Sequence, residues 1–383
     1  MLTGPTAMDR LFERIDVARN HTLAWLDAMQ ADGSPEGVMR ISAAHRPSAW
    51  PGMLLPGTYN GIMCRELLDG FEGWSAARRA ALVAWLEAHR LPDGRFRVPG
   101  MTDPDVFKKP DPDETWRYID WHVTNYGLGA VDALEPGRPA RLAFAEPYLD
   151  PPFLKAWLAD RDLRDPWQEG NNIVNLASFL LLLRRDVDAA TGRRVAAALD
   201  VLLDWHDRLR EPTTGFWGVG QLSDPTRLLH AFAGSMHNFH IWYHEGLPLP
   251  GQDKAVDYCL SLPPAIDSAC IDVDAVDVLV HGRRLLDHRR GEIDAWLTEL
   301  LEALLAFQNP DGGFCDVREG VRRQDGWVRG YEEPQGLSNT FATWFRWIAI
   351  AMIADALQPD RRTWNFRRMI GIGYRGPQGR SRP

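Results

Sequence analysis

The sequence FQNPDGGF at residues 307–314 recurs along the chain in weaker copies. HRLPDGRF (89–96) and LREPTTGFWG (209–218) repeat its Pro and its Gly before an aromatic residue, and QADG (30–33) is the shortest copy. Gly in such a turn supplies the positive φ that ends a helix. A turn that returns at long intervals indicates a repeat architecture, in which each repeat is one supersecondary unit.

A helix with a shared Trp precedes most of these turns. The tripeptide AWL occurs at four places and DWH at 204–206 is a variant of it. The turn positions imply a unit of roughly 50–60 residues, so six units fill the 383 residues. The AWL copies stand at 24–26, 84–86, 156–158 and 295–297, and the turn positions are Asp32, Asp93, Thr213 and Asp311.

The pattern of each unit predicts two helices, and almost no segment between them has the pattern of a strand. The first helix is amphipathic, and the second is less polar and rich in small residues. This alternation predicts an all-α fold, an (α/α)6 toroid of six outer/inner helical hairpins around a central bore; an open solenoid is the rival. The expected outer helices include 8–30, 75–90, 192–210 and 291–308, and the inner helices are 58–69, 115–134, 170–185, 227–245, 269–287 and 337–357.

The repeat leaves little of the chain outside the toroid. We expect residues 1–7 to form an N-terminal extension and 8–370 to form a single toroid domain. The end of the chain, GYRGPQGRSRP, is basic and rich in Gly and Pro, so we expect 371–383 to be a disordered tail.

FQNPDGGF resembles the repeat of the terpenoid cyclase and protein prenyltransferase superfamily of helical toroids. In that superfamily a Gln-x-x-Asp-Gly-Gly-aromatic turn joins an outer to an inner helix, as Gln308–Phe314 does here. The resemblance covers most of the chain as a repeat, and only this last copy is strict. It implies the toroid fold; type II cyclases usually add a second helical domain, for which this chain has no room.

Every expected inner helix carries a polar stripe in its first turns. Many buried polar groups around one axis are better explained by a wet or ligand-filled cavity than by a dry core. Long loops and helix N-termini gather at one mouth, which would suit an anionic group. The stripes supply the candidate substrate-binding residues Tyr118, His122, Asn125, Asn172, Asn175, His237, His244, Asn339 and Arg346.

ACIDVDAVD at residues 269–277 holds the candidate catalytic acids. Helical spacing places Asp274 and Asp277 on the bore face with Cys270 and His281, whereas Asp272 falls on the opposite side. Two close carboxylates separate each other's pKa values, so one can stay protonated. The segment is similar to the Asp-x-Asp-Asp motif of type II terpene cyclases, which implies that Asp274 is the acid, although Ala275 replaces the last Asp.

The three His residues of HNFHIWYH (237–244) share one face of the next helix. His240 is the candidate for proton transfer to or from these acids. Zinc ligation by this cluster is the weaker interpretation, because the zinc-ligand spacing of the prenyltransferases is not reproduced, and we expect neither a metal nor a cofactor. Arg346 either binds a substrate anion or pairs with an Asp of the bore, and rings for cation–π contact or sugar stacking are Trp121, Trp217, Trp242 and Trp344.

The composition limits the classes of partner that we expect for the protein. A net charge of −9 argues against nucleic acid and anionic membranes. No signal sequence, membrane span or disulfide-like Cys spacing is recognisable, so we expect a cytoplasmic protein; its oligomeric state is open. The expected partner is a small-molecule or oligosaccharide substrate.

Three functions remain open at this point. The resemblance implies an isoprenoid cyclase that acts by protonation in a deep bore. The hydrophilic bore residues favour a carbohydrate-active enzyme on the same fold, a glycosidase, lyase or epimerase. The third interpretation is a toroid that binds a ligand without catalysis.

Overall fold

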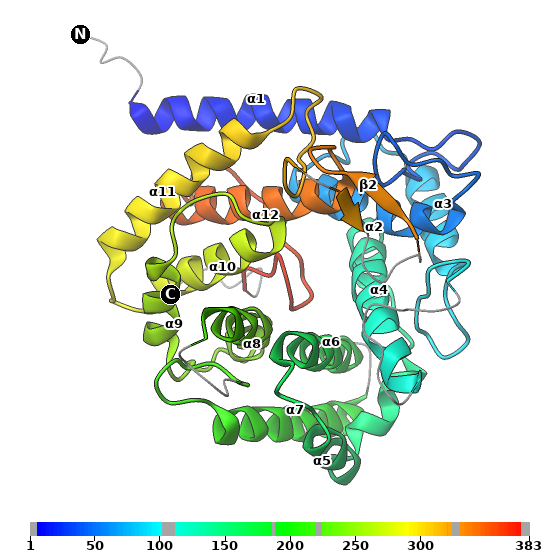
Figure 1. Cartoon of the computed structure of the whole chain (residues 1–383). Coiled ribbons are helices and arrows are strands. Elements are labelled where there is room, and N and C mark those ends of the chain that lie inside the picture. The colour runs from blue at the N-terminus through cyan, green and yellow to red at the C-terminus, as the bar shows by residue number, and fades with distance from the viewer. Residues whose placement is uncertain are drawn as a thin grey trace.

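The computed structural model describes residues 6–101, 112–185, 188–218, 224–319, 321–323 and 330–376. Within these residues, twelve α-helices alternate between the outside and the inside of one ring (Figure 1). The outer helices are α1 (Ala7–Ala28), α3 (Ala76–Glu87), α5 (Pro151–Ala159), α7 (Ala189–Leu209), α9 (Gln252–Ser261) and α11 (Arg290–Phe307). The inner helices are α2 (Leu54–Leu67), α4 (Pro112–Leu134), α6 (Pro166–Arg185), α8 (Pro225–Glu245), α10 (Ala269–Leu285) and α12 (Thr340–Leu357).

The ring is closed. Each inner helix contacts the next one in chain order, and α12 returns to contact α2. Figure 1 shows the outer helices wrapped around this inner ring, with the first helix, α1, beside the last pair. The prediction of an (α/α)6 toroid is therefore confirmed, and the open solenoid is excluded.

The repeated turn attaches the outer to the inner helix in the same way in four of the hairpins. Its glycine takes a positive φ in all four copies, at Gly33, Gly94, Gly215 and Gly312. Shortly after that glycine, a backbone N–H donates to a hydroxyl on the following inner helix, over 2.8–3.0 Å. The four pairs are Met39 with Thr58, Phe96 with Thr124, Trp217 with Ser235, and Phe314 with Thr343.

The strict copy of the turn also joins the two ends of the ring. The Gln308 amide donates to the Ala18 carbonyl, 2.9 Å away on α1, and to the Gly312 carbonyl. Thr22 of α1 donates to the same Gly312 carbonyl. A side chain at Gly312 would collide with the His21 carbonyl, so this contact between α11 and α1 needs a glycine.

Short elements fill the loops. The 3₁₀-helices are η1 (Pro51–Met53) and η2 (Ala143–Leu149). The strands β1 (Val321–Arg323) and β2 (Glu332–Pro334), which the sequence did not reveal, form an antiparallel pair before α12. Helix α12 is long and apolar enough to cross a membrane, but 83% of that window is buried inside the ring.

The structure departs from the prediction at the C-terminal end of the chain. Thr6 caps α1, so the helix starts where the extension was expected to stop. The expected disordered tail is wrong for 371–376, because Ile372 and Tyr374 are buried in the core. Figure 1 shows this C-terminal segment running inside the ring. Residues 377–383 lie outside the described part of the chain.

Candidate functional site

A cavity of about 440 Å³ opens at the N-terminal ends of the inner helices. This lies within the usual range of about 300–1,000 Å³ for ligand pockets. Its walls come from α4, α6, α8, α10 and α12, the loop before α12, and the C-terminal segment. The lining residues are Tyr118, Ile119, His122, Tyr126, Asp165, Trp167, Gln168, Asn171, His230, His237, Ser268, Cys270, Asp316, Phe341, Phe345 and Ile372.

The cavity has an acidic rim, and rings line its interior, among them the imidazoles of His122 and His237. Asp165 and Ser268 stand just before α6 and α10, and Asp316 lies in the loop before α12. Residues further along the helices, such as Tyr126 and Phe345, supply rings to the interior. A ligand with a polar head and a hydrocarbon tail would match this gradient.

Asp274 lies just below the cavity, one helical turn beyond Cys270 on α10. Its carboxyl group is fully buried, and neither of its oxygens has a hydrogen-bond partner. Burial raises the pKa of Asp274 well above its usual value, and the nearby carboxylates of Asp277 and Asp272 add to the shift. This shift favours the protonated, neutral form of the carboxyl group.

His237 stands between this acid and the cavity. Its Nε2 is 3.7 Å from Oδ1 of Asp274, and the same side chain lines the cavity. Burial lowers the pKa of His237 to about 3 and that of His122 to about 4. Both imidazoles are thus neutral at pH 7 and able to accept a proton.

Asp277 faces a different histidine. His240 Nε2 is 2.9 Å from Oδ1 of Asp277, and the Gly371 N–H donates to Nδ1 of His240 over 3.0 Å. Because Nδ1 of His240 accepts a hydrogen bond, the ring hydrogen is on Nε2, and Nε2 donates a hydrogen bond to Asp277. These residues, predicted to be catalytic, lie below the cavity and hold the C-terminal segment.

His240, Asp277 and His281 place their ligand atoms within 4.8 Å of one another, close enough for a metal ion. Their hydrogen bonds do not fit one. Arg284 Nη2 donates to Nδ1 of His281 over 2.9 Å, so both imidazoles receive a proton donor at Nδ1. Their Nε2 atoms then carry hydrogen where a metal would need a lone pair.

Arg346 does not reach the cavity. It is fully buried, forms an ion pair with Asp272, and donates to the Asp316 carbonyl over 2.8 Å. The partner that the sequence left open is thus Asp272, which faces the neighbouring helix α12. Burial raises the pKa of Asp272 to about 6, although Arg346 opposes the shift.

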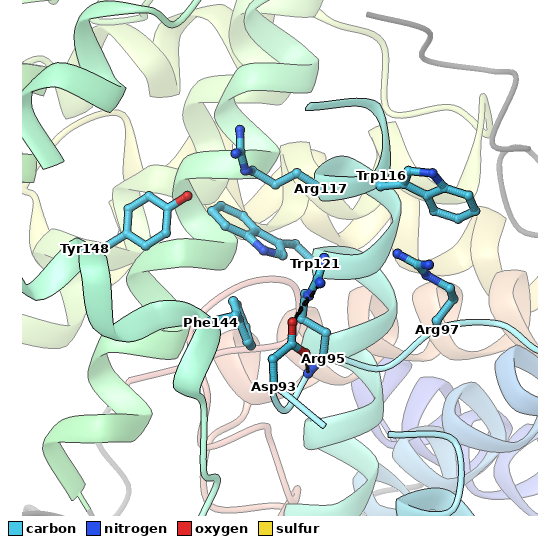
Figure 2. A pocket seen from close by; sticks show the side chains of 8 residues that line it. All are labelled: Asp93, Arg95, Arg97, Trp116, Arg117, Trp121, Phe144 and Tyr148. Carbon is cyan, nitrogen blue, oxygen red and sulfur yellow. Dashed lines mark hydrogen bonds and ion pairs between the residues drawn. The ribbon is translucent and has the colours of Figure 1, made fainter. Parts of the chain in front are cut away.

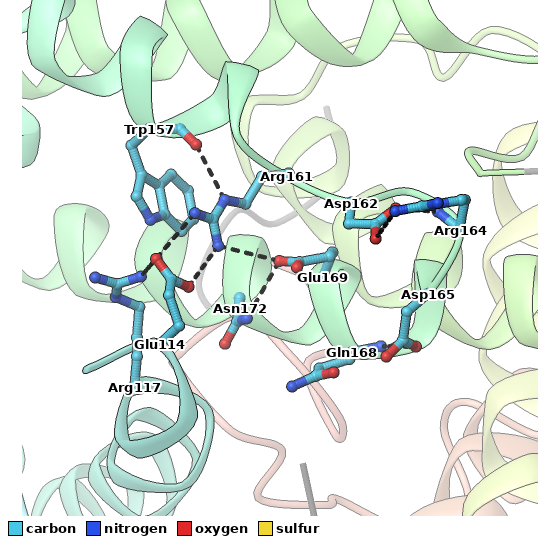
Figure 3. A network of polar contacts seen from close by, with 10 residues as sticks. All are labelled: Glu114, Arg117, Trp157, Arg161, Asp162, Arg164, Asp165, Gln168, Glu169 and Asn172. Carbon is cyan, nitrogen blue, oxygen red and sulfur yellow. Dashed lines mark hydrogen bonds and ion pairs between the residues drawn. The ribbon is translucent and has the colours of Figure 1, made fainter. Parts of the chain in front are cut away.

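The predicted asparagines serve the framework. Asn125 donates to Asn175 over 2.7 Å and accepts from Arg367 of the C-terminal segment over 2.6 Å. Asn172 donates to Glu169, which pairs with the buried Arg161 (Figure 3). Within the same helix, Asn171 is the asparagine that lines the cavity.

Two further predicted binding residues lie elsewhere. Asn339 caps α12 by accepting from the Ala342 N–H over 2.8 Å, a role that uses its side-chain oxygen. His244 lies at the last turn of α8 and bonds Glu245 over 2.8 Å. Neither residue lines the cavity, so their predicted role in substrate binding finds no support in the position of their side chains.

Three of the predicted tryptophans point away from the bore. Trp121 packs on Tyr148 and Phe144 and lines a separate surface pocket of about 390 Å³ (Figure 2). Trp217 and Trp242 stack on each other, with ring centroids 5.8 Å apart. Trp344 is the exception, since it meets the cavity residue Tyr126 edge to face.

Several residues of the cavity wall were not among those predicted from the sequence. Tyr126 continues the stripe of Tyr118 and His122 at i+4, and Phe341 and Phe345 repeat that spacing on α12. This spacing is visible in the sequence and could have identified the three residues. Ile372 was not recoverable in the same way, because it reaches the cavity from a segment without helical periodicity.

The structure is similar to that of the type II terpene cyclase MstE from Scytonema, solved as an arginine-to-alanine variant with its substrate geranylgeranyl dihydroxybenzoate. The two chains share 14% identity with a TM-score of 0.50, and the alignment covers 91% of this chain and 99% of that chain. The chain has the helical toroid fold of a type II terpene cyclase.

The ligand-free structure of MstE also matches, at 14% identity and a TM-score of 0.48, over 90% of this chain and 99% of that chain. No protein-family model matches the chain, and no curated protein does.

Proposed function

We propose that the protein is a cyclase that protonates an isoprenoid substrate, with Asp274 as the proton donor. The observation that carries this proposal is a fully buried carboxyl group without a hydrogen-bond partner, directly beneath a cavity that aromatic side chains line. Burial raises the pKa of this group well above its usual value. The similarity to a type II terpene cyclase supports the same chemistry. The proton donor has to keep its proton and be held apart from water, and the burial of Asp274 favours both.

The reaction would begin at the last alkene of the chain. The Asp274 O–H bond breaks and a C–H bond forms at the terminal alkene carbon, which leaves a carbocation on its neighbour. The π electrons of the next alkene then form the ring bond and move the cation along the chain. Loss of a proton to a neutral histidine such as His122 restores an alkene. His122 then releases this proton to solvent, and Asp274 takes one up from solvent, so the cycle consumes no net proton.

The walls suit such a cation. Tyr126, Phe341 and Phe345 present rings to the cavity, and an aromatic face stabilises a nearby positive charge. In this structure His237 and Cys270 cover the acid, so the terminal alkene has to reach it between these two side chains.

The substrate class follows from the gradient of the cavity. A polar aromatic head would lie at the rim near Asp165, Ser268 and Asp316, with the prenyl tail toward Asp274. MstE was solved with a molecule of this type, a prenylated dihydroxybenzoate. We therefore propose a prenylated aromatic compound as the substrate.

The carbohydrate alternative has less support. Among the described residues, the carboxylates that line the cavity are those of Asp165 and Asp316. Each accepts a backbone N–H at a helix start, from Gln168 and Ala269. A glycosidase would instead use two carboxyl groups that face the glycosidic bond.

The test is activity of wild type and Asp274→Asn on geranylgeranyl dihydroxybenzoate and on uronic-acid oligosaccharides. We expect the wild type to cyclise the prenyl compound. The Asp274→Asn variant should lose cyclase activity by about 10³-fold or more, because it lacks the general acid. Asp120→Asn is the control, because Asp120 is equally buried but pairs with Arg95 and Arg97 outside the bore. Equal activity of Asp274→Asn and wild type would remove Asp274 from the mechanism, and turnover of the oligosaccharide alone would favour the alternative.

A further inference from the structure

The C-terminal segment, residues 364–376, occupies the bore below the cavity. Figure 1 shows it inside the ring of inner helices. The buried side chains of the segment include Trp364, Phe366, Met369, Ile370, Ile372 and Tyr374. Such a density of apolar contacts fixes the segment as part of the core rather than as a tail.

Hydrogen bonds attach the segment to five of the six inner helices. Its Arg368 bonds Glu66 of α2, its Arg367 bonds Asn125 of α4, and the N–H of Gly371 donates to His240 of α8. The remaining two attachments are Tyr374 to His281 of α10, over 3.3 Å, and Arg375 to Asp355 of α12, over 2.9 Å.

The segment folds back on itself beneath the cavity. The Arg367 N–H donates to the Gly373 carbonyl over 3.1 Å, and the Tyr374 N–H donates to the Gly371 carbonyl over 3.0 Å. Gly371 and Gly373 both have a positive φ, 113° and 84°. This turn presents one side chain of the segment to the cavity, that of Ile372.

We propose that Ile372 forms the floor of the cavity and sets the length of the prenyl chain that the site accepts. The inference rests on the proposed isoprenoid substrate and names the residue that limits the length of its prenyl chain. A tail directed inward from the polar rim ends at this side chain. A smaller residue at 372 would admit a longer tail, and a larger one would exclude it.

The same segment supplies a matched control. Ile370 is as buried as Ile372, at 1% and 3% exposed, but it does not line the cavity. Ile370→Ala and Ile372→Ala remove the same atoms from one segment. A difference between them in ligand preference therefore reports on the cavity and not on stability.

Binding can be measured without turnover. The probes are dihydroxybenzoates that carry fully saturated branched chains of 15, 20 or 25 carbons, since a saturated chain cannot be protonated. Dissociation constants are determined by calorimetry for wild type, Ile370→Ala, Ile372→Ala and Ile372→Phe, with thermal unfolding to show that each variant is folded.

We expect Ile372→Ala to improve binding of the next longer chain about tenfold relative to the chain that wild type prefers. Ile372→Phe shifts the preference to a shorter chain, and Ile370→Ala keeps the wild-type order. Should wild type bind the probes while both Ile372 variants keep its order, the floor assignment is overturned and the proposed substrate stands. Should wild type bind none of them, the isoprenoid substrate falls, and this inference with it.

Discussion

Asp274 and Asp277 stand one turn apart on α10, and the structure gives them different neighbours. Asp277 accepts a hydrogen bond from His240, whereas Asp274 lies 3.7 Å from His237 with no hydrogen bond to its oxygens. A carboxylate with a donor is stabilised in its charged form, and one without a donor is not. This difference in partners is the reason we propose Asp274, and not Asp277, as the proton donor.

Asp274→Asn is expected to stabilise the protein at neutral pH. The native state keeps Asp274 protonated where the unfolded chain ionises it, so wild type loses stability as the pH rises above the unfolded pKa of about 3.9. Asn carries no such penalty. The difference in free energy of unfolding should be near zero below about pH 4 and should grow by up to about 1.4 kcal/mol per pH unit above it.

Urea unfolding of both proteins between pH 4 and pH 8 measures that difference. Other titrating groups cancel, because they are common to the two proteins. A difference that stays constant with pH would show that Asp274 is ionised in the native state.

Arg346 and Asp272 should behave as a structural ion pair. Both are buried, so Arg346→Met leaves Asp272 without its partner and should cost about 3–5 kcal/mol of stability. The double variant Arg346→Met/Asp272→Asn should recover most of this loss, because no buried charge remains. A double-mutant cycle by chemical unfolding gives the coupling, and additive losses would contradict the pairing.

At the scale of elements, the recurrent contact is between a turn and the inner helix that follows it. Four hydroxyl groups accept a backbone N–H from just after the turn, at Thr58, Thr124, Ser235 and Thr343. The hydroxyl satisfies a buried N–H that neither helix can bond. This contact explains why the turn motif survives in copies that have lost most of their sequence likeness.

Thr343→Val should therefore destabilise the last hairpin. Valine keeps the volume of threonine but leaves the N–H of Phe314 without an acceptor, which costs about 1–3 kcal/mol. Thr298→Val is the control, because the Thr298 hydroxyl donates to Asp294 within α11 and serves no other element. Urea midpoints for the two variants check the prediction, and equal losses would show that the turn contact is not special.

The sequence predicted the positions of the helices better than it predicted which side chains face the bore. The inner helices and the four outer helices for which bounds were predicted lie within a few residues of those bounds, because the repeat and the 3.6-residue period are local signals. No bounds were predicted for the outer helices α5 and α9. Trp121, Trp217 and Trp242 were assigned to the bore, yet they pack outward. An inner helix of a toroid is apolar on both sides, so periodicity cannot say which side an aromatic residue takes.

At the scale of the whole molecule, the ring and its C-terminal segment depend on each other. The ring is closed at α1, α11 and α12, and the segment inside it bonds five inner helices. Its Gly- and Pro-rich end gave no sign of this, because Ile372 and Tyr374 find apolar neighbours only after the toroid has formed. The cavity floor is thus a property of the assembled fold.

Removal of residues 364–383 should prevent cooperative folding. The described part of this stretch buries six large apolar side chains, each worth about 1.5–3 kcal/mol. Their sum is comparable to the total stability of an ordinary domain, about 5–15 kcal/mol. We expect the truncated chain to lose its sharp thermal transition and to bind a hydrophobic dye at 37 °C. A synthetic peptide of residues 364–376 added in trans should restore the transition, because those residues carry every contact named above. A truncated chain that melts like the full one would show that the toroid is complete without its floor.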